Sequence, residues 1–180
     1  MKTKLCLLIL LIVGLSVQLS ANPINGLLER IDKGASKKFV IEFKKGADDF
    51  FELDQKGTKV VVRGNNYVNI ATGINWYLKY YAGIQLSWNG MQAKLPQVLP
   101  PVPRKERHET SLSLRYDFNY CTYSYTMAFW DWERWEKEID WMALHGINLP
   151  LAAVGQECIW FNMLQKLGYS KDCLLYTSDA

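Results

Sequence analysis

The stretch from Leu114 to Trp160 constrains the fold most, because it reads as one strand–helix–strand unit. An extended polar and aromatic segment comes first, an amphipathic helical segment follows, and a short apolar run closed by Gly155 ends the unit. Units of this kind are typical of α/β proteins with parallel strands. The sequence therefore predicts the α/β fold class.

Local signals place a helix between the two predicted strands. Asp131 is suited to cap its first turn, and Gly146 is suited to end it. The apolar run from 147 to 154 then predicts a strand buried on both faces. Four residues of the helix recur at helical spacing and should form one buried apolar face: Trp132, Trp135, Ile139 and Met142.

A small α/β domain is predicted before this unit, over residues 22–95. Amphipathic patterns predict helices over 24–31 and 67–81, and alternating patterns predict strands over 39–43, 50–54, 59–63 and 84–88. Four prolines between 96 and 103 and the charged run from Arg104 to Glu109 follow. We interpret residues 96–110 as a solvated linker, and place the start of the second domain at residue 111.

The two ends of the chain carry processing signals. Lys2 and Lys4 precede an apolar run that ends at Leu19, and small residues follow, which is typical of a signal peptide over residues 1–21. We expect export to the periplasm or the extracellular space, with no membrane attachment after cleavage; a retained anchor is the alternative. Residues 173–180 read like a translated sequencing adaptor, so we expect the second domain to be truncated at residue 172.

Composition excludes several classes of function. A formal net charge of +3 without a basic run gives no sign of a surface that binds nucleic acid. Cys121 and Cys158 are the cysteines outside the signal and the tail, and they form no metal-ligand spacing with His108 or His145. We therefore expect neither a metal site nor a cofactor.

Aromatic residues and isolated polar residues offer only weak functional signals. All seven tryptophans lie between Trp76 and Trp160, where they could stack on sugar rings, although core packing is the simpler interpretation. Glu157 follows a predicted strand end, but a charge in the first turn of a helix explains it more simply. Asp117 and Cys121 have no partner in the sequence that would make a catalytic pair.

Three segments carry a resemblance to a known family. They are R-Y-D-F-N-Y-C-T-Y-S-Y-T from Arg115, W-D-W-E-R-W-E-K-E-I-D-W-M-A-L-H-G-I-N-L from Trp130, and G-Q-E-C-I-W from Gly155. Together they resemble the alpha-N-acetylglucosaminidase family of glycoside hydrolases. The resemblance implies a (β/α)8 TIM-type barrel beginning near Leu112. It also implies removal of terminal alpha-linked N-acetylglucosamine from a glycan, with retention of configuration.

The resemblance also sorts the candidate site residues. Both catalytic glutamates of the family lie on later barrel strands, so no catalytic residue is assigned here and the fragment alone should be inactive. Asn119 and Cys121 match positions that line the sugar pocket of the family, and their offset of two would put both side chains on one face of a strand. His145 and Pro150 depart from the family pattern, and Pro150 should delay or bulge the second strand.

Two alternatives remain open from the sequence. The aromatic content also suits a carbohydrate-binding protein without catalysis. A related barrel glycosidase with a different sugar specificity would share the same opening segments.

Overall fold

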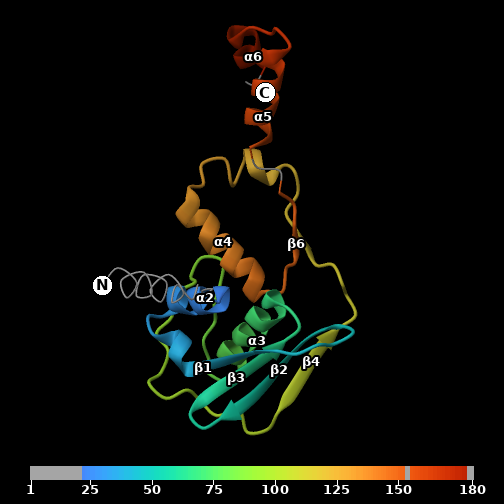
Figure 1. Cartoon of the computed structure of the whole chain (residues 1–180). Helices are drawn as coiled ribbons and strands as arrows, with labels where there is room; N and C mark the ends of the chain where they lie inside the picture. Colours follow the sequence, from blue (N-terminus) through green and yellow to red (C-terminus); the bar gives the residue numbers. More distant parts are fainter. Residues whose placement is uncertain (1–21, 153–154, 178–180) are drawn as a thin grey trace, which may run out of the picture.

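The computed structural model describes residues 22–152 and 155–177 (Figure 1). The predicted signal peptide lies outside these residues, and so do residues 178–180 of the predicted tail. Within the described ranges, no helix combines the length and the apolar character needed to cross a membrane.

The N-terminal half is built on a mixed sheet of four strands. Their order is β1, β3, β2, β4, with β1 parallel to β3 and the other pairs antiparallel. The predictions of the first three strands are confirmed. The strands are β1 (Phe39–Phe43), β2 (Asp49–Lys56), β3 (Lys59–Gly64) and β4 (Glu106–Thr110).

The fourth strand lies where the sequence predicted a linker. Glu106–Thr110 pairs with Asp49–Leu53 as β4, so the prediction of a solvated connector is wrong for these residues. The strand predicted over 84–88 is also wrong: in the structure Ser87 makes only an isolated bridge with Gly90. The proline segment before β4 packs on the domain as well, because Leu99 and Val102 are buried in its core.

Two helices cover one face of the sheet. They are α2 (Pro23–Ile31) and α3 (Tyr67–Tyr80), and Figure 1 shows α3 lying between the sheet and the later helix α4. Asn66 caps α3 by accepting a hydrogen bond from the backbone N–H of Asn69. Gly73 lets α3 approach closely, since a Cβ there would lie 2.9 Å from Val62 Cγ1. The buried side chains of both helices join those of the sheet in one apolar core.

The other face of the sheet carries charges. Glu52 is almost fully buried there, and Lys44, Lys105 and Arg107 pair with its carboxylate at 2.6, 2.9 and 3.2 Å. Burial raises the pKa of Glu52, but hydrogen bonds from these three cations outweigh it and lower the pKa to about 2. Ion pairs and the Phe50 ring, which is buried under Arg107, therefore hold this face, whereas the opposite face is held by apolar packing.

The second half begins with a short parallel pair of strands. β5 (Tyr116–Asp117) pairs in parallel with β6 (Leu149–Pro150), and α4 (Trp132–Leu144) connects them, as the strand–helix–strand prediction required. The turn η2 (Thr122–Ser124) precedes α4, as η1 (Ala35–Lys38) precedes β1. α5 (Gln156–Lys166) and α6 (Lys171–Thr177) stand at the end of the molecule far from the sheet (Figure 1).

The second predicted strand is shorter and more exposed than expected. β6 ends at Pro150, and Leu149 is 41% exposed, so burial on both faces is wrong for this strand. Residues 153–154 of the predicted strand lie outside the described residues.

The orientation of α4 corrects another prediction. Trp132 and Ile139, two members of the predicted buried face, are 68% and 47% exposed, whereas Glu138 and Asp140 are buried. Asp140 accepts two hydrogen bonds from Arg30 on α2, at 2.6 and 2.7 Å. Ion pairing with the N-terminal half therefore turns the acidic flank of α4 inward. Asp131 caps α4, and Gly146 follows its end with φ 80°, as predicted.

Candidate functional site: the loop after the first barrel strand

The C-terminal end of β5 leads directly into the segment with the candidate sugar ligands. β5 ends at Asp117, so Asn119 and Cys121 lie in the following loop, 118–131, and not on one face of a strand as predicted. Both residues are nevertheless exposed, at the end of a parallel strand pair. Loops at this end of the strands are where barrel proteins place their ligand-binding groups.

Phe118 turns the chain from β5 into the loop through a left-handed backbone conformation. Phe118 has φ 73°, a conformation that costs a bulky residue roughly 1–3 kcal/mol unless its surroundings hold it. Tyr123 and Trp135 contact the Phe118 ring, with centroids 6.0 and 6.4 Å away. Asp117 supports the same turn, because its Oδ1 accepts a hydrogen bond from the Phe118 N–H at 2.8 Å.

The side chain of Asn119 stabilises the backbone of the loop. Its Oδ1 accepts hydrogen bonds from the backbone N–H groups of Cys121 and Thr122, at 3.0 and 3.3 Å. This arrangement begins the 3-10 turn η2, and it leaves the side-chain NH2 group of Asn119 pointing away from the turn's backbone donors. Cys121 lies beside Tyr120, and a hydrogen bond with the thiol raises the pKa of the Tyr120 hydroxyl.

Next to the loop is a hollow of about 310 Å³. Its walls combine aromatic rings with one carboxylate, a combination suited to a ligand with apolar and polar faces. Glu157 lies in the first turn of α5, which confirms its position at a helix N-terminus. The lining residues are Tyr123, Ser124, Met127, Ala128, Trp135, Gly155 and Glu157.

The acidic residues of α4 are committed to other partners. Glu133 pairs with Lys137 at 2.9 Å, and Glu138 accepts hydrogen bonds from the Trp88 indole and pairs with Arg134. Asp140 is bound by Arg30, as described above. Glu138 and Asp140 therefore hold the helix in place, whereas Glu133 pairs within the helix, and none of the three lines the hollow beside the loop.

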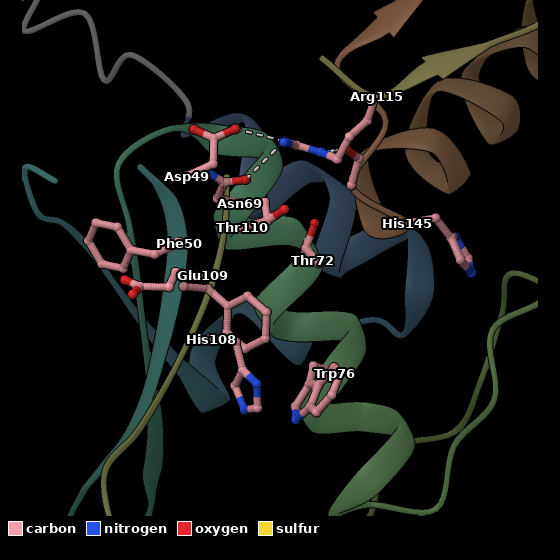
Figure 2. Close-up of a pocket in the computed structure, with 12 residues that line it drawn as sticks. Asp49, Phe50, Asn69, Thr72, Trp76, His108, Glu109, Thr110, Arg115 and His145 are labelled. Carbon is pink, nitrogen blue, oxygen red and sulfur yellow. Dashed lines mark hydrogen bonds and ion pairs between the residues drawn. The ribbon is translucent and has the colours of Figure 1, made fainter. Parts of the chain in front are cut away.

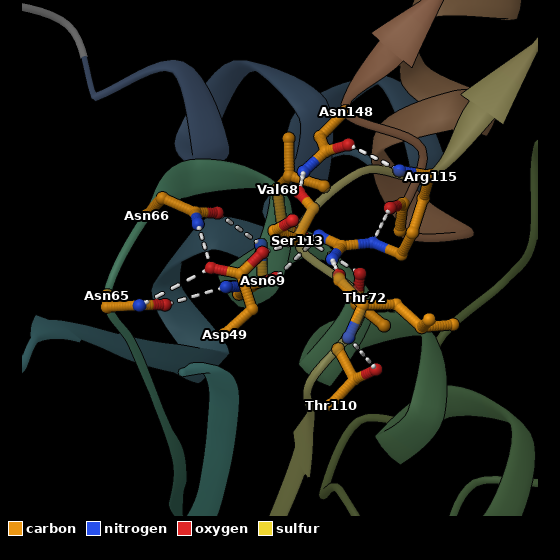
Figure 3. Close-up of polar contacts among 12 residues, drawn as sticks. Asp49, Asn65, Asn66, Val68, Asn69, Thr72, Thr110, Ser113, Arg115 and Asn148 are labelled. Atoms are coloured by element: carbon orange, nitrogen blue, oxygen red, sulfur yellow. Dashed lines mark hydrogen bonds and ion pairs between the residues drawn. The ribbon is translucent and has the colours of Figure 1, made fainter. Parts of the chain in front are cut away.

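Arg115, which the sequence reasoning missed, joins the two halves of the molecule (Figure 3). Its guanidinium donates to Asp49 at 2.8 Å and to Asn69 at 3.3 Å in the N-terminal half. The same side chain donates to the carbonyl oxygens of Leu112 and Gly146. Burial raises the pKa of Asp49, but the hydrogen bond from Arg115 helps to lower it below its usual value. The only sequence signal was an arginine directly before a strand.

A cavity of about 200 Å³ lies at this junction (Figure 2). Trp76 and His108 form one wall, with ring centroids 4.3 Å apart. Thr72 of α3 and His145, the residue directly after α4, also line the cavity. Its volume is below that of typical small-molecule sites. The junction around Arg115 is therefore tightly packed, whereas loop 118–131 is open. The predicted sugar-binding residues, Asn119 and Cys121, lie in the loop.

Comparisons with known proteins bear on both halves. Residues 22–101 match the family described as the Alpha-N-acetylglucosaminidase (NAGLU) N-terminal domain. Residues 115–176 match the Alpha-N-acetylglucosaminidase (NAGLU) tim-barrel domain. The boundary between the two matches coincides with β4 and the approach to Arg115.

Individual relatives agree with these matches. The chain is 41% identical over 140 residues to the human protein Alpha-N-acetylglucosaminidase, and the match covers 78% of this chain and 19% of the relative. Solved structures of a family 89 glycoside hydrolase from Clostridium perfringens superimpose with a TM-score of 0.79 at 38% identity. The superposition covers 85% of this chain and 18% of the relative.

Those structures are complexes of the relative with small molecules. One is a complex with 2-acetamido-1,2-dideoxynojirmycin, and another, with two glutamates replaced by glutamine, is a complex with its substrate GlcNAc-alpha-1,4-galactose. This chain spans about a fifth of the length of these relatives. The two family models match successive parts of the chain, and the observed N-terminal α/β domain and the first parallel strands agree with them. The chain therefore belongs to the alpha-N-acetylglucosaminidase family, glycoside hydrolase family 89.

Proposed function

We propose that this chain forms the N-terminal part of an exported exo-glycosidase that removes terminal alpha-linked N-acetylglucosamine from glycans. The observation that carries the proposal is the loop after β5, which presents Asn119 and Cys121 at the strand end where barrel proteins bind ligands. Support comes from the 38% identity to a glycoside hydrolase whose structure holds GlcNAc-alpha-1,4-galactose.

The two loop residues have different roles in the proposal. The Oδ1 atom of Asn119 is occupied by backbone N–H groups, so its NH2 group is the part that would donate to a sugar oxygen. The exposed thiol of Cys121 would line the pocket and make a weaker polar contact. Neither residue is a catalytic acid or base, and both would act by orienting the sugar.

Retention of configuration needs two carboxyl groups, about 5 to 5.5 Å apart, on either side of the glycosidic bond. One protonates the leaving oxygen, and the other attacks the anomeric carbon; water then cleaves the glycosyl-enzyme bond. The carboxylates of α4 are held in ion pairs, so the proposal assigns both roles to glutamates of later barrel strands. The two glutamates replaced in the substrate complex of the relative support this assignment.

A chimera tests the proposal directly. The segment of the Clostridium perfringens enzyme that corresponds to residues 22–172 is replaced by this chain, and hydrolysis of GlcNAc-alpha-1,4-galactose is followed by proton NMR. We expect N-acetylglucosamine as the product, because this chain completes the sugar pocket and the Clostridium perfringens segment supplies the catalytic glutamates. In the same chimera, Asn119→Ala should raise KM about tenfold, because the variant loses both the hydrogen bond to the sugar and the Oδ1 acceptor that orders the loop.

Thermal unfolding establishes that the chimera is folded, and a second chimera that carries only residues 115–131 serves where the larger one fails to fold. A folded chimera that binds 2-acetamido-1,2-dideoxynojirmycin without hydrolysis would show that this chain does not place the sugar against the catalytic glutamates, which the Clostridium perfringens segment supplies. One that hydrolyses only a different glycoside would favour another sugar specificity. Either result would contradict the proposal.

Export forms a separate part of the proposal. Fusion of residues 1–25 to alkaline phosphatase lacking its own signal should give active enzyme in the bacterial periplasm, because the phosphatase folds only after export. Replacing Leu10 and Ile12 by arginine interrupts the apolar run and should abolish that activity. Equal activity with and without the two arginines would contradict export through this segment.

A further inference from the structure

Trp88 reaches from the N-terminal half to the helix that supports the candidate sugar loop. It lies in the segment between α3 and β4, and its indole N–H donates to Glu138 Oε2 at 2.6 Å. Glu138 is almost fully buried and also pairs with Arg134, at 2.9 Å. A buried carboxylate with two such donors fixes the position of both.

Arg134 connects Trp88 with the end of the loop. Its guanidinium carbon lies 4.8 Å from the centroid of the Trp88 ring and 3.9 Å from that of Trp130. The two indole rings themselves are 6.2 Å apart. A cation between two aromatic faces is attracted to both of them. Trp130, the last ring of the loop, is thereby tied to the N-terminal half.

The ring contacts continue from Trp130 to the start of the loop. Trp130 packs edge-on against Trp135 at 5.0 Å, and Trp135 stacks on Tyr123 at 6.2 Å. Both Trp135 and Tyr123 contact Phe118, the left-handed residue directly before Asn119. One continuous set of contacts therefore leads from Trp88 to both ends of loop 118–131.

We propose that Trp88 is a positioning residue for loop 118–131, so that the N-terminal domain determines how Asn119 and Cys121 are presented. The strained backbone of Phe118 needs support from its neighbours. The chain of rings supplies that support, and Trp88 with Glu138 and Arg134 anchors its far end. The ordering of the loop stands on these contacts alone, whereas its consequence for sugar binding rests on the proposed function.

Cys121 is exposed, but in the ordered loop its thiol is hydrogen-bonded with Tyr120, so its labelling rate responds to loosening of the loop. The full chain is treated with iodoacetamide, and the labelling of each cysteine-containing peptide is followed by mass spectrometry. Cys158 on α5 is the internal reference, because it is exposed and makes no contact with Trp88 in the described residues. We expect Trp88→Leu to increase the labelling rate of Cys121, relative to Cys158, by about twofold, because a looser loop releases the thiol from Tyr120.

Two variants separate positioning from a general loss of stability. Trp88→Phe keeps a ring beside Arg134 but loses the N–H, so the labelling rate of Cys121 should return most of the way to that of the unchanged chain. Trp76→Leu removes another indole of the N-terminal half, one that packs on Phe51 and His108 instead, and should leave the ratio unchanged. An unchanged ratio in Trp88→Leu, or an equal rise in Trp76→Leu, would overturn the proposal.

The effect on sugar binding is measured in the active chimera. Trp88→Leu should raise KM for GlcNAc-alpha-1,4-galactose severalfold and leave kcat within about twofold, because the variant loosens a ligand loop and not the reacting groups. A chimera without activity would refute the proposed function but leave the labelling result standing. Unchanged KM in an active chimera, despite faster labelling of Cys121, would refute the link between loop order and sugar binding.

Discussion

The two halves of the molecule bury their apolar residues in different ways. Helix α3 buries Ile70, Ile74 and Tyr77 completely against the sheet. In the second half, α4 leaves Trp132 and Ile139 exposed and turns charged side chains toward the N-terminal half. The first half has a core of its own. Helix α4 adds only its C-terminal end to that core, through Leu144 and Ala143, and the rest of α4 is held to the first half mainly through polar contacts.

The largest effect is expected from Ile74→Ala, because this change leaves a cavity in the N-terminal core. Ile74 is fully buried, so the free energy of unfolding should fall by about 3–4 kcal/mol. Urea denaturation followed by circular dichroism measures the change. A loss below about 1 kcal/mol would show that the core does not carry the first half.

Arg115→Ala tests the junction between the halves. The change removes the donors to Asp49, Asn69 and two backbone carbonyls, and leaves Asp49 partly buried without its cation. We expect a loss of about 3 kcal/mol for the docking of the second half. Amide hydrogen exchange should rise in α4 and β6 but not in β1 or β3. Arg115→Lys, the matched control, keeps the charge but cannot form the same set of hydrogen bonds.

Acid should weaken the first half through Glu52. Its folded-state pKa of about 2 lies below the ordinary value of 4.5, so its stabilisation is complete above about pH 4.5 and is lost as the pH falls toward 2. The loss should amount to roughly 2–3 kcal/mol over this range, allowing for the exposure of its three cations. Denaturation at several pH values measures it, and Glu52→Gln should flatten the dependence. An unchanged slope in that variant would assign the acid sensitivity elsewhere.

The smallest effect is expected from Ile139→Ala, the counterpart of Ile74→Ala on α4. Its side chain is 47% exposed, so the free energy of unfolding of this chain should change by no more than about 0.5 kcal/mol. The same urea series measures both isoleucine variants. Equal losses in the two would remove the contrast between the halves.

Local patterns predicted the elements whose partners are close in sequence. The helix over Tyr67–Tyr80 and the strands β1 to β3 follow from the alternation and spacing of their own apolar residues. β4 was missed because its sequence is charged. On this sheet edge Arg107 covers Phe50 and pairs with Glu52, and Glu109 is exposed, so the strand resembles a connector in the sequence. The inward face of α4 was missed because its partner, Arg30, is remote in the sequence.

The candidate site was predicted only in part. Asn119 and Cys121 were selected as candidate sugar-binding residues through the family resemblance. Their role in sugar binding stays a prediction. The prediction that both lie on a strand was wrong because the backbone leaves extended geometry at Phe118. No sequence pattern predicts a phenylalanine with positive φ. The role proposed for Trp88 depends on contacts across about 50 residues, which spacing alone could not predict.

The position of Arg115 also bears on the order of events during synthesis. Every partner of its guanidinium in the N-terminal half precedes it in the chain, and Gly146 follows shortly after. Domains generally fold as units during synthesis, with N-terminal ones first. The first strand of the barrel therefore emerges next to a surface that is already complete, and it can be fixed in place before its later neighbours exist.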